Sequence, residues 1–211
     1  MKAATANTSR RRYTMRARAA SAHATREKIL DAAVELFLGR GYADTTLTLV
    51  AEAAGVSLQT VMRYFATKDE LMLAAAEARS TIESEKRAKP PGEGAAVAHV
   101  LADRYEDTGR AMMQFVAVED RVDTVAAVLA RARESHRQWL ATVFADALPR
   151  RRGPLRERRL AQLFGVTELY VWVSWRRRLG MTRAHAERAM AETLDAVLAS
   201  WTDGMRKRDE R

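Results

Sequence analysis

Hydrophobic positions in the first part of the chain recur at steps of three and four, which is the spacing of one face of an α-helix. The first such run places Ile29, Ala33 and Phe37 in one row, and it predicts a helix over about residues 25–40. Gly41 follows directly, and a glycine at this position is typical of a helix C-terminus. We expect this helix to build the core of a small N-terminal domain.

Two short helical patterns come next, and Gly55 joins them. Leu47, Val50 and Ala54 share one face of the first pattern, which Thr45 or Thr46 can cap. Gly55 supplies the positive φ that a tight turn between two helices requires. A second helix can begin at once after Ser57, whose hydroxyl suits an N-cap. A short helix supported by its neighbour in this way can enter the major groove of DNA.

The rest of the chain also has helical patterns, so the predicted fold is all-α with about nine helices. The segment 67–70 has the form of a capping box and opens a helix to about Ala88. The clearest break is Lys89-Pro90-Pro91-Gly92-Glu93-Gly94. Further helices are expected over about 94–109, 110–119, 122–148, 154–179 and from Thr182 onwards. Apolar residues surround most of the helix expected over 154–179, so it must be covered on several sides.

The front of the chain resembles the DNA-binding domain of the TetR family of bacterial transcriptional regulators. The resemblance rests on five pieces in the family's order, namely Ile29-Leu30-Asp31-Ala32-Ala33-Val34-Glu35-Leu36-Phe37, Arg40-Gly41-Tyr42, Thr45-Thr46, Val50-Ala51-Glu52-Ala53-Ala54-Gly55-Val56-Ser57 and Tyr64-Phe65-Ala66-Thr67-Lys68-Asp69-Glu70-Leu71. These pieces cover about a quarter of the chain, and the remainder resembles the family only in length and helical layout. The resemblance implies a helix-turn-helix DNA-binding domain over 25–72 after a basic arm over 1–24. An effector-binding and dimerisation domain over 73–211 would follow.

The same resemblance implies which residues touch DNA. They lie at the start of the second helix, on the third and at the start of the fourth, namely Thr46, Thr48, Ser57, Leu58, Gln59, Thr60, Arg63, Tyr64 and Lys68. Gln59 and Arg63 carry side chains that can pair with adenine or guanine edges. Tyr64 can instead be a half-buried packing residue. Met62 departs from the family, in which a tyrosine is common at this step.

The positive charge of the chain is concentrated in its N-terminal arm. The formal net charge is +9, and the residues before Thr25 include six basic ones and no acidic one. Nine basic residues face ten acidic ones over 25–89, so charge supports the DNA-binding hypothesis without carrying it. The arm lacks apolar periodicity and is expected to be disordered in the free protein. Its arginines either follow the phosphates or the minor groove of DNA, or form a solvated tail; they are Arg10, Arg11, Arg12, Arg16 and Arg18.

The helices after the break are rich in methionine and aromatic residues, which can line an apolar effector cavity. The candidate lining residues are Met112, Met113, Phe115, Trp139, Phe144, Tyr170 and Trp172, with His136, Glu168 and also His99 as polar anchors. Each can equally be an ordinary core or surface residue. The last two helices of two chains can form an intermolecular four-helix bundle, or they can close the core of one chain.

Several other classes of protein are disfavoured. The chain has no cysteine, and its four histidines lack the spacing of a metal site, so we expect no metal, no cofactor and no enzyme activity. No apolar run approaches the ~20 residues of a membrane span, and a cytoplasmic protein without a membrane partner is expected. The resemblance implies a homodimer that binds a palindromic operator in double-stranded DNA and is released by an apolar or amphipathic effector.

Two alternatives to this ligand-released repressor stay open. One is a dimeric regulator without a small-molecule effector, which activates transcription or is controlled by protein contacts. The more distant one is a helical small-molecule-binding protein that has lost operator recognition.

Overall fold

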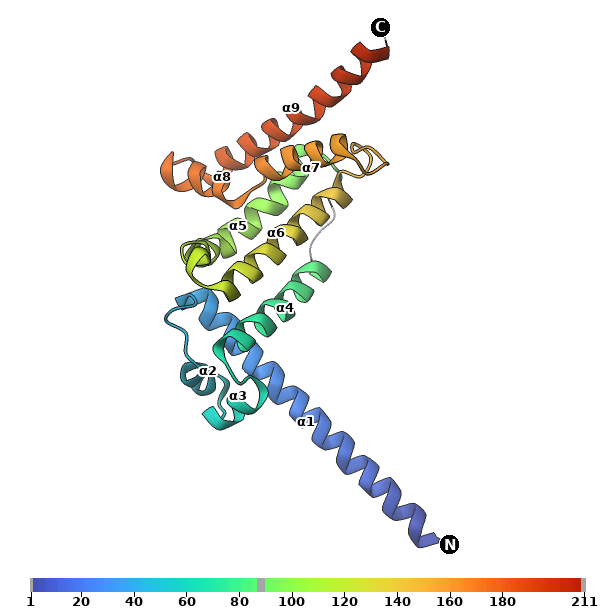
Figure 1. Ribbon diagram of the computed structural model, residues 1–211, viewed down its shortest axis with the longest axis vertical. Helices are drawn as coiled ribbons and strands as arrows, with labels where there is room; N and C mark the ends of the chain where they lie inside the picture. Colours follow the sequence, from blue (N-terminus) through green and yellow to red (C-terminus); the bar gives the residue numbers. More distant parts are fainter. Residues whose placement is uncertain (1, 87–89, 210–211) are drawn as a thin grey trace. The chain divides into compact units, whose positions relative to one another are not determined.

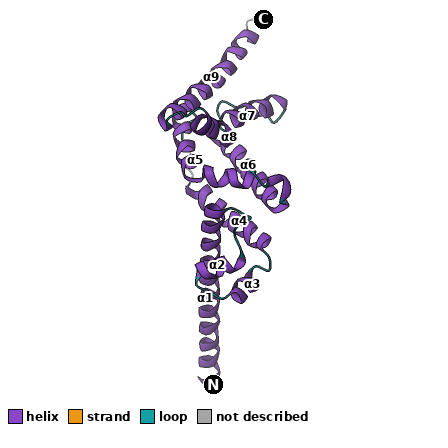
Figure 2. Ribbon diagram, turned by 90° about the vertical axis from the view of Figure 1, so that its left-hand side faces the viewer, coloured by secondary structure: helices purple, strands orange, loops and turns teal. Residues whose placement is uncertain are grey.

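The structure is a computed structural model that describes residues 2–86 and 90–209, with side chains over 18–80 and 90–202. This described part of the chain is helical and contains no β-strand (Figures 1 and 2), which confirms the predicted all-α class. The chain divides into two compact units, Met1–Ser84 and Glu85–Arg211. The functional boundary expected at residue 72 stays a prediction.

The first unit consists of α1 (Lys2–Arg40), α2 (Leu47–Ala54), α3 (Leu58–Tyr64) and α4 (Lys68–Lys86). In Figure 1, α2 and α3 lie beside the C-terminal half of the long helix α1. The helix begins at Lys2 rather than near residue 25, because the preceding segment contains alanine and arginine and neither glycine nor proline. The expectation that the arm 1–24 is disordered concerns the free protein in solution and stays a prediction.

The core of this unit takes apolar residues from all four helices. The row predicted for the first helix is confirmed, since Ile29, Ala33 and Phe37 of α1 are buried. One residue from each of the other helices is completely buried, namely Val50, Val61 and Leu71. Each short helix therefore has an inner face fixed by packing, which leaves the opposite face of α3 directed away from the core.

The second unit contains five α-helices and two shorter turns within the described residues. These are α5 (Gly94–Val116), the 3₁₀ turn η1 (Glu119–Arg121), α6 (Asp123–Val143), α7 (Pro154–Val166), α8 (Leu169–Val173), the π-helical turn η2 (Ser174–Arg178) and α9 (Arg183–Asp209). α5 packs along α9, and α6 packs against α7. Their shared core includes Val97, Leu101, Leu140, Leu163, Met190 and Leu194.

Two predictions about these helices were wrong. The helices expected over 94–109 and 110–119 are one helix, α5, in which Gly109 is buried. A Cβ atom at Gly109 would lie 3.2 Å from Leu169 Cδ1, so this glycine permits a close approach and does not mark a turn. The helix expected over 154–179 is three pieces, because the carboxylate of Glu168 accepts the N–H of Tyr170 and caps a new helix.

The remaining boundaries differ less. The expected break before α5 is confirmed for residues 90–93, which are not helical, whereas residues 87–89 lie outside the described part. α6 ends at Val143 and not at Leu148, with turns between it and α7. Pro154 stands in the first turn of α7 as predicted.

Candidate nucleic-acid interface and ligand cavity

The turn between α2 and α3 is held by bonds to close neighbours in the sequence. Thr46 is the N-cap of α2, and its Oγ1 accepts the Leu49 N–H at 3.2 Å. Gly55 ends α2 with φ 66° and ψ 35°, and its own N–H bonds back to Ala51 and Glu52 carbonyls. The left-handed conformation predicted for Gly55 is therefore confirmed, as is the threonine cap.

The third helix starts from a second side-chain cap. Ser57 Oγ accepts the Thr60 N–H at 3.1 Å and lies 2.9 Å from the Thr60 hydroxyl. Val61 and Phe65 are buried on the inner side, as their spacing predicted. With one end capped and one face packed, α3 is a fixed support for the side chains on its other face.

That outer face of α3 carries polar and apolar groups together. Gln59 and Arg63 are exposed, and so are Leu58 at 40% and Met62 at 50%. Four large hydrophobic side chains are exposed among the residues with described side chains, and two of them are this pair on α3. We refer to Leu58, Gln59, Met62 and Arg63 as the reading face. Its two apolar members lie one helical turn apart, where a partner molecule can cover both.

Tyr64, a predicted phosphate contact, already has a protein partner. It is half-buried, and its hydroxyl donates to the Ala22 carbonyl of α1 at 3.1 Å. The Arg63 guanidinium lies 5.3 Å from the Tyr64 ring centre. Tyr64 thus connects the end of α3 to α1, and this packing agrees with the alternative considered for it.

Lys68 is likewise half-buried and bonded within the protein. Its Nζ donates to the Tyr42 carbonyl at 3.0 Å and lies 4.1 Å from the Tyr42 ring centre. Tyr42 also donates its hydroxyl to the carboxylate of Asp69. Burial, followed by the bond to Asp69, raises the pKa of Tyr42 to about 12. Tyr42 was not among the predicted site residues. Its contacts with Lys68 and Asp69 at the start of α4, which suggest a role in the site, are seen only in the structure.

The other predicted residues around α3 occupy two kinds of position. Thr46, Thr48 and Ser57 are exposed, whereas Thr60 is half-buried. At the start of α4 the predicted capping box forms in part. The Glu70 N–H donates to Thr67 Oγ1 at 3.1 Å, but the Glu70 carboxylate accepts from the Ala66 N–H.

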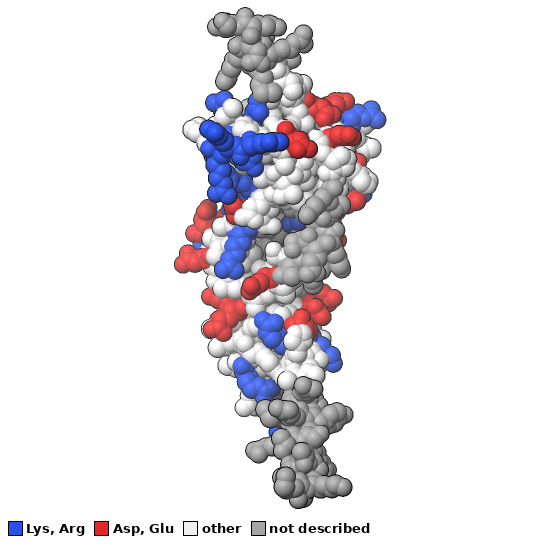
Figure 3. Space-filling model, turned by 90° about the vertical axis from the view of Figure 1, so that its right-hand side faces the viewer, with Lys and Arg blue, Asp and Glu red and all other residues white. Residues whose placement is uncertain are grey.

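The face in Figure 3 carries Lys and Arg beside Asp and Glu, and neither sign covers it alone. Of the arm arginines, Arg18 is exposed. The side chains of Arg10, Arg11, Arg12 and Arg16 lie outside the described side chains, so their roles stay predictions.

The second unit contains a small cavity between α5, α6, α7 and the start of α8. Its volume is about 70 Å³, well below the roughly 300–1,000 Å³ of typical ligand pockets. The lining residues are Arg104, Tyr105, Thr108, Met112, Val116, Leu129, Ala132, Arg133, His136, Phe164, Glu168, Leu169 and Tyr170. The wall is apolar over most of its area, with a few polar groups.

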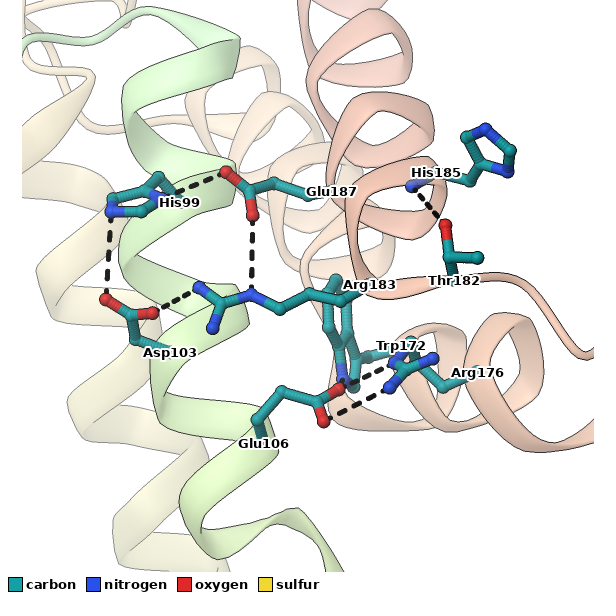
Figure 4. A network of polar contacts seen from close by, with 9 residues as sticks. All are labelled: His99, Asp103, Glu106, Trp172, Arg176, Thr182, Arg183, His185 and Glu187. Atoms are coloured by element: carbon teal, nitrogen blue, oxygen red, sulfur yellow. Dashed lines mark hydrogen bonds and ion pairs between the residues drawn. The ribbon is translucent and has the colours of Figure 1, made fainter.

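The predicted lining residues separate into two groups. Met112, His136, Glu168 and Tyr170 line the cavity. Five others do not, since Met113 is half-buried elsewhere and four are buried in the protein interior, namely Phe115, Trp139, Phe144 and Trp172. His99 is also absent from the wall, and its Nδ1 lies 3.0 Å from Glu187 on the exposed surface (Figure 4).

Sequence reasoning missed the polar residues that α5 and α6 direct into the cavity, chiefly Tyr105 and Arg133. Arg133 forms a two-bond ion pair with Glu119, and this bond lowers the pKa of the Glu119 carboxyl. The Tyr105 hydroxyl donates to the Thr167 carbonyl at 2.5 Å. No short motif contains these pairs, because the two members of each come from different elements.

Two further features of the structure bear on the classes of protein disfavoured by the sequence. The residues it describes include no group of three or more His, Cys, Asp or Glu side chains that could hold a metal ion. No helix within the same residues is both long and apolar enough to cross a bilayer.

Known proteins resemble both parts of the chain. Residues 29–75 match the family described as bacterial regulatory proteins, tetR family. The HTH-type transcriptional regulator TcmR of Streptomyces glaucescens is 31% identical over 133 residues, which is 57% of this chain and 59% of TcmR. The HTH-type transcriptional regulator SrpR of Pseudomonas putida is 41% identical over 61 residues, or 29% of each chain.

Solved structures extend the likeness of fold over most of the chain. A tetR-family transcriptional regulator from Streptomyces coelicolor has a TM-score of 0.67 and 21% identity, over 86% of this chain and 83% of that one. The multidrug binding protein EbrR, solved with proflavin, has a TM-score of 0.57 and 19% identity, over 80% and 99% of the two chains. The capped helices around Gly55 and the match over residues 29–75 lead to one conclusion: the N-terminal part of this chain is a DNA-binding domain of the TetR family of bacterial regulatory proteins, and the rest of the chain shares the fold of such regulators.

Proposed function

We propose that this protein is a dimeric transcriptional regulator that represses from a palindromic operator in double-stranded DNA and is released by a small-molecule effector. Enzyme activity forms no part of the proposal, because proteins of the TetR family are regulators and not enzymes. Its place of action is the cytoplasm, where its DNA target lies. The observation that supports operator binding most directly is the reading face of α3.

The reading face has the mixture of groups that base recognition requires. Gln59 and Arg63 are exposed and can pair with adenine and guanine edges in the major groove. Leu58 and Met62 are exposed beside them and can contact thymine methyl groups. Thr46 and Thr48 at the start of α2 are candidate phosphate or base contacts, together with Ser57 and Thr60 on the same side of the turn.

Tyr64 and Lys68 have a double role in this proposal. Each holds a bond within the first unit, to Ala22 and Tyr42, and each stands beside the reading face. We expect them to fix the position of α3 against α1 and α4, and to meet a phosphate from that fixed position. Through the Ala22 bond, α1 and its basic arm would keep a defined place beside the DNA.

Dimerisation supplies the second reading face. One recognition helix reads only a few base pairs, and two at a spacing of one or more helical turns read a palindrome. Leu179 is 67% exposed at the end of η2, and Tyr170 is 41% exposed on α8. Large apolar groups left in water here favour a contact between copies of the chain that includes α8, and the part of α9 in that contact belongs to the proposal.

The effector would occupy the cavity of the second unit. Four of the predicted residues line it, and two of them, Glu168 and Tyr170, begin α8. EbrR, which shares the fold, was solved with proflavin, a small aromatic molecule. An effector that binds one arrangement of the dimer better than another would shift the population away from the DNA-binding form.

The second candidate is a dimeric regulator without a small-molecule effector. The size of the cavity favours it, since about 70 Å³ holds far less than a drug-sized molecule. Its polar residues also bond to the protein, as Arg133 does to Glu119. In this case protein contacts would control the chain, or it would activate transcription.

A binding assay with the DNA upstream of its own gene tests the proposal. Gln59→Ala is expected to reduce the preference for operator over random DNA by about 1–3 kcal/mol, because one paired base contact is lost. Gln114→Ala is the matched control, since Gln114 is exposed on α5 in the other unit. Equal losses on both DNAs for Gln59→Ala would refute base reading, and no preference for any duplex in the unaltered chain would refute the function.

A further inference from the structure

Thr167, between α7 and α8, is completely buried and has a partner for each side-chain hydrogen-bonding function. Its Oγ1 donates to the Leu163 carbonyl at 2.8 Å and lies 2.9 Å from His136 Nε2. A hydroxyl has one proton to donate, and here Leu163 receives it. His136 is therefore the donor in its bond to Thr167, just as Tyr105 donates to the Thr167 carbonyl.

The partners that hold Thr167 are also walls of the cavity. Tyr105 comes from α5 and His136 from α6, and both line it. Only Thr167 and Glu168 separate the end of α7 from the start of α8, and Glu168 is a lining residue too. We call Thr167 and Glu168 the joint. Its bonds to α5 and α6 come from side chains that a bound molecule would touch.

The residue next to Tyr105 holds the other end of α8. Glu106 accepts the indole N–H of Trp172 at 3.1 Å and the Nε–H of Arg176 at 2.7 Å (Figure 4). The hydrogen bond from Arg176 lowers the pKa of Glu106, so the carboxylate stays charged near neutral pH. α8 is thus attached to α5 at its start through Tyr105 and at its end through Glu106.

We propose that a molecule in the cavity loosens the joint by taking the hydrogen bonds of Tyr105 and His136 away from Thr167. This inference rests on the proposed function, because it assumes that the effector binds in this cavity. Both side chains donate, so the molecule must offer an acceptor. The other walls are largely apolar. Of their charged members, Arg133 is paired with Glu119, and Arg104 and Glu168 carry opposite signs, so the wall favours no charged molecule. The effector class is therefore a small apolar molecule with a carbonyl or a similar uncharged acceptor.

Opening of the joint follows from the lost bonds. Without Tyr105 and His136, the carbonyl and hydroxyl of Thr167 remain buried with fewer partners, which disfavours the closed form. The small size of the cavity acts in the same direction, because a molecule of more than a few atoms can be enclosed there only if α8 moves. α8 and η2 precede α9, so the response would reach the elements proposed for dimerisation.

Hydrogen exchange of the full-length protein tests the joint without any ligand. Thr167→Val removes the acceptor of His136, and Tyr105→Phe removes the donor to the Thr167 carbonyl. In both variants the amides of residues 169–179 should exchange roughly three- to tenfold faster, as expected for one lost hydrogen bond. Thr167→Ser keeps the hydroxyl and should match the unaltered protein. Unchanged exchange, or an equal rise over residues 97–102 of α5, would overturn the inference.

A pair of probes of equal shape tests the effector class. Acetophenone carries a carbonyl, and α-methylstyrene has a CH₂ group in place of the oxygen. At saturating concentration, acetophenone should speed exchange over residues 169–179 about threefold or more, whereas α-methylstyrene should not. Equal effects of the two probes, or no effect of acetophenone, would contradict the role of an acceptor.

Failure of this inference and failure of the proposed function give different results. If acetophenone speeds exchange over residues 169–179 but the chain binds no operator, the inference stands and the proposed function falls. If a compound releases operator DNA while residues 169–179 keep their exchange rate, the proposed function stands and the joint is not the route.

Discussion

The chain turns sharply between two short helices at two places, and the two turns are held in opposite ways. At the turn between α2 and α3, Ser57 caps α3 through a residue three positions away, and Gly55 bonds back to α2. At the joint, Thr167 bonds to His136 and Tyr105, which lie 31 and 62 positions away. The hydrogen bonds that hold the first turn are therefore local. The second depends on what lies next to it, which suits a turn that responds to a ligand.

The largest expected effect is on the free energy of unfolding. It tests how far the stability of the second unit depends on packing near the joint between residues that are far apart in the sequence. Trp172→Ala should lower the free energy of unfolding by about 3–5 kcal/mol, because Trp172 is 2% exposed and leaves a cavity. Trp172→Phe is the control that retains most of the ring volume. Denaturant titration of the full-length protein measures both, and a loss below about 1 kcal/mol for the alanine variant would contradict the packing described here.

The next effect tests the local character of the first turn. Gly55→Ala should cost about 1–2 kcal/mol of stability, since φ is 66° and no heavy atom lies within 4 Å of an added Cβ. The loss of stability would therefore come from backbone strain and not from a steric clash. Gly39→Ala adds a methyl group in equally open space within α1, and it should be neutral or stabilising. Thermal unfolding compares the two, and equal melting temperatures would refute the strain argument.

A smaller change sharpens the same point at the helix cap. Ser57→Ala should destabilise α3 by about 1 kcal/mol, because the Thr60 N–H loses its acceptor. Ser57→Asn supplies another cap and should retain most of the stability. The measurement is denaturant unfolding of the full-length protein. Equal losses for both substitutions would mean that stability depends on the serine hydroxyl itself and not on having a side-chain acceptor for the Thr60 N–H.

The smallest effect concerns pH and the far end of α8. A carboxyl whose pKa is lowered on folding stabilises the protein above its ordinary pKa of 4.5, and this contribution disappears as the pH falls through the lowered pKa. Glu106→Gln should therefore reduce stability at pH 7 and lose this effect in acid. The side chain is 36% exposed, so screening keeps the difference below about 1 kcal/mol. A difference that is constant from pH 7 to pH 3 would exclude the ion pair as its cause.

The contrast between the two turns also explains what the sequence could predict. Thr46, Gly55 and Ser57 act on residues within a few positions, so the caps, the glycine turn and the exposed side of α3 follow from local rules. Gly109 was misread because its role is contact with Leu169, far along the chain. Local rules treat a glycine in mid-helix as a break, and only the packing of α8 on α5 shows otherwise.

The cavity was predicted less well for the same reason. Aromatic and methionine content predicted lining residues on helices that do border the cavity, yet Trp139, Phe144 and Trp172 are buried in the core and not in the cavity wall. Residue type cannot separate these two environments, since both are apolar. The sequence near Tyr105 gives no sign of its role. Its hydrogen-bond partner, Thr167, lies 62 positions away at the boundary between α7 and α8, and the sequence analysis expected one continuous helix there.

The π-helical turn η2 has a consequence for how this region tolerates changes in length. Between Ser174 and Leu179 the backbone bond spans five residues, with the Leu179 N–H on the Ser174 carbonyl at 2.9 Å. An α-helical turn would close the same bond with one residue fewer. Removing a single arginine here would thus leave a regular α-helical turn, and the residues that follow would keep their direction because the extra residue is contained in the π turn. Sequence alignments of relatives should accordingly place one-residue gaps at this turn, with the apolar face of α9 unchanged.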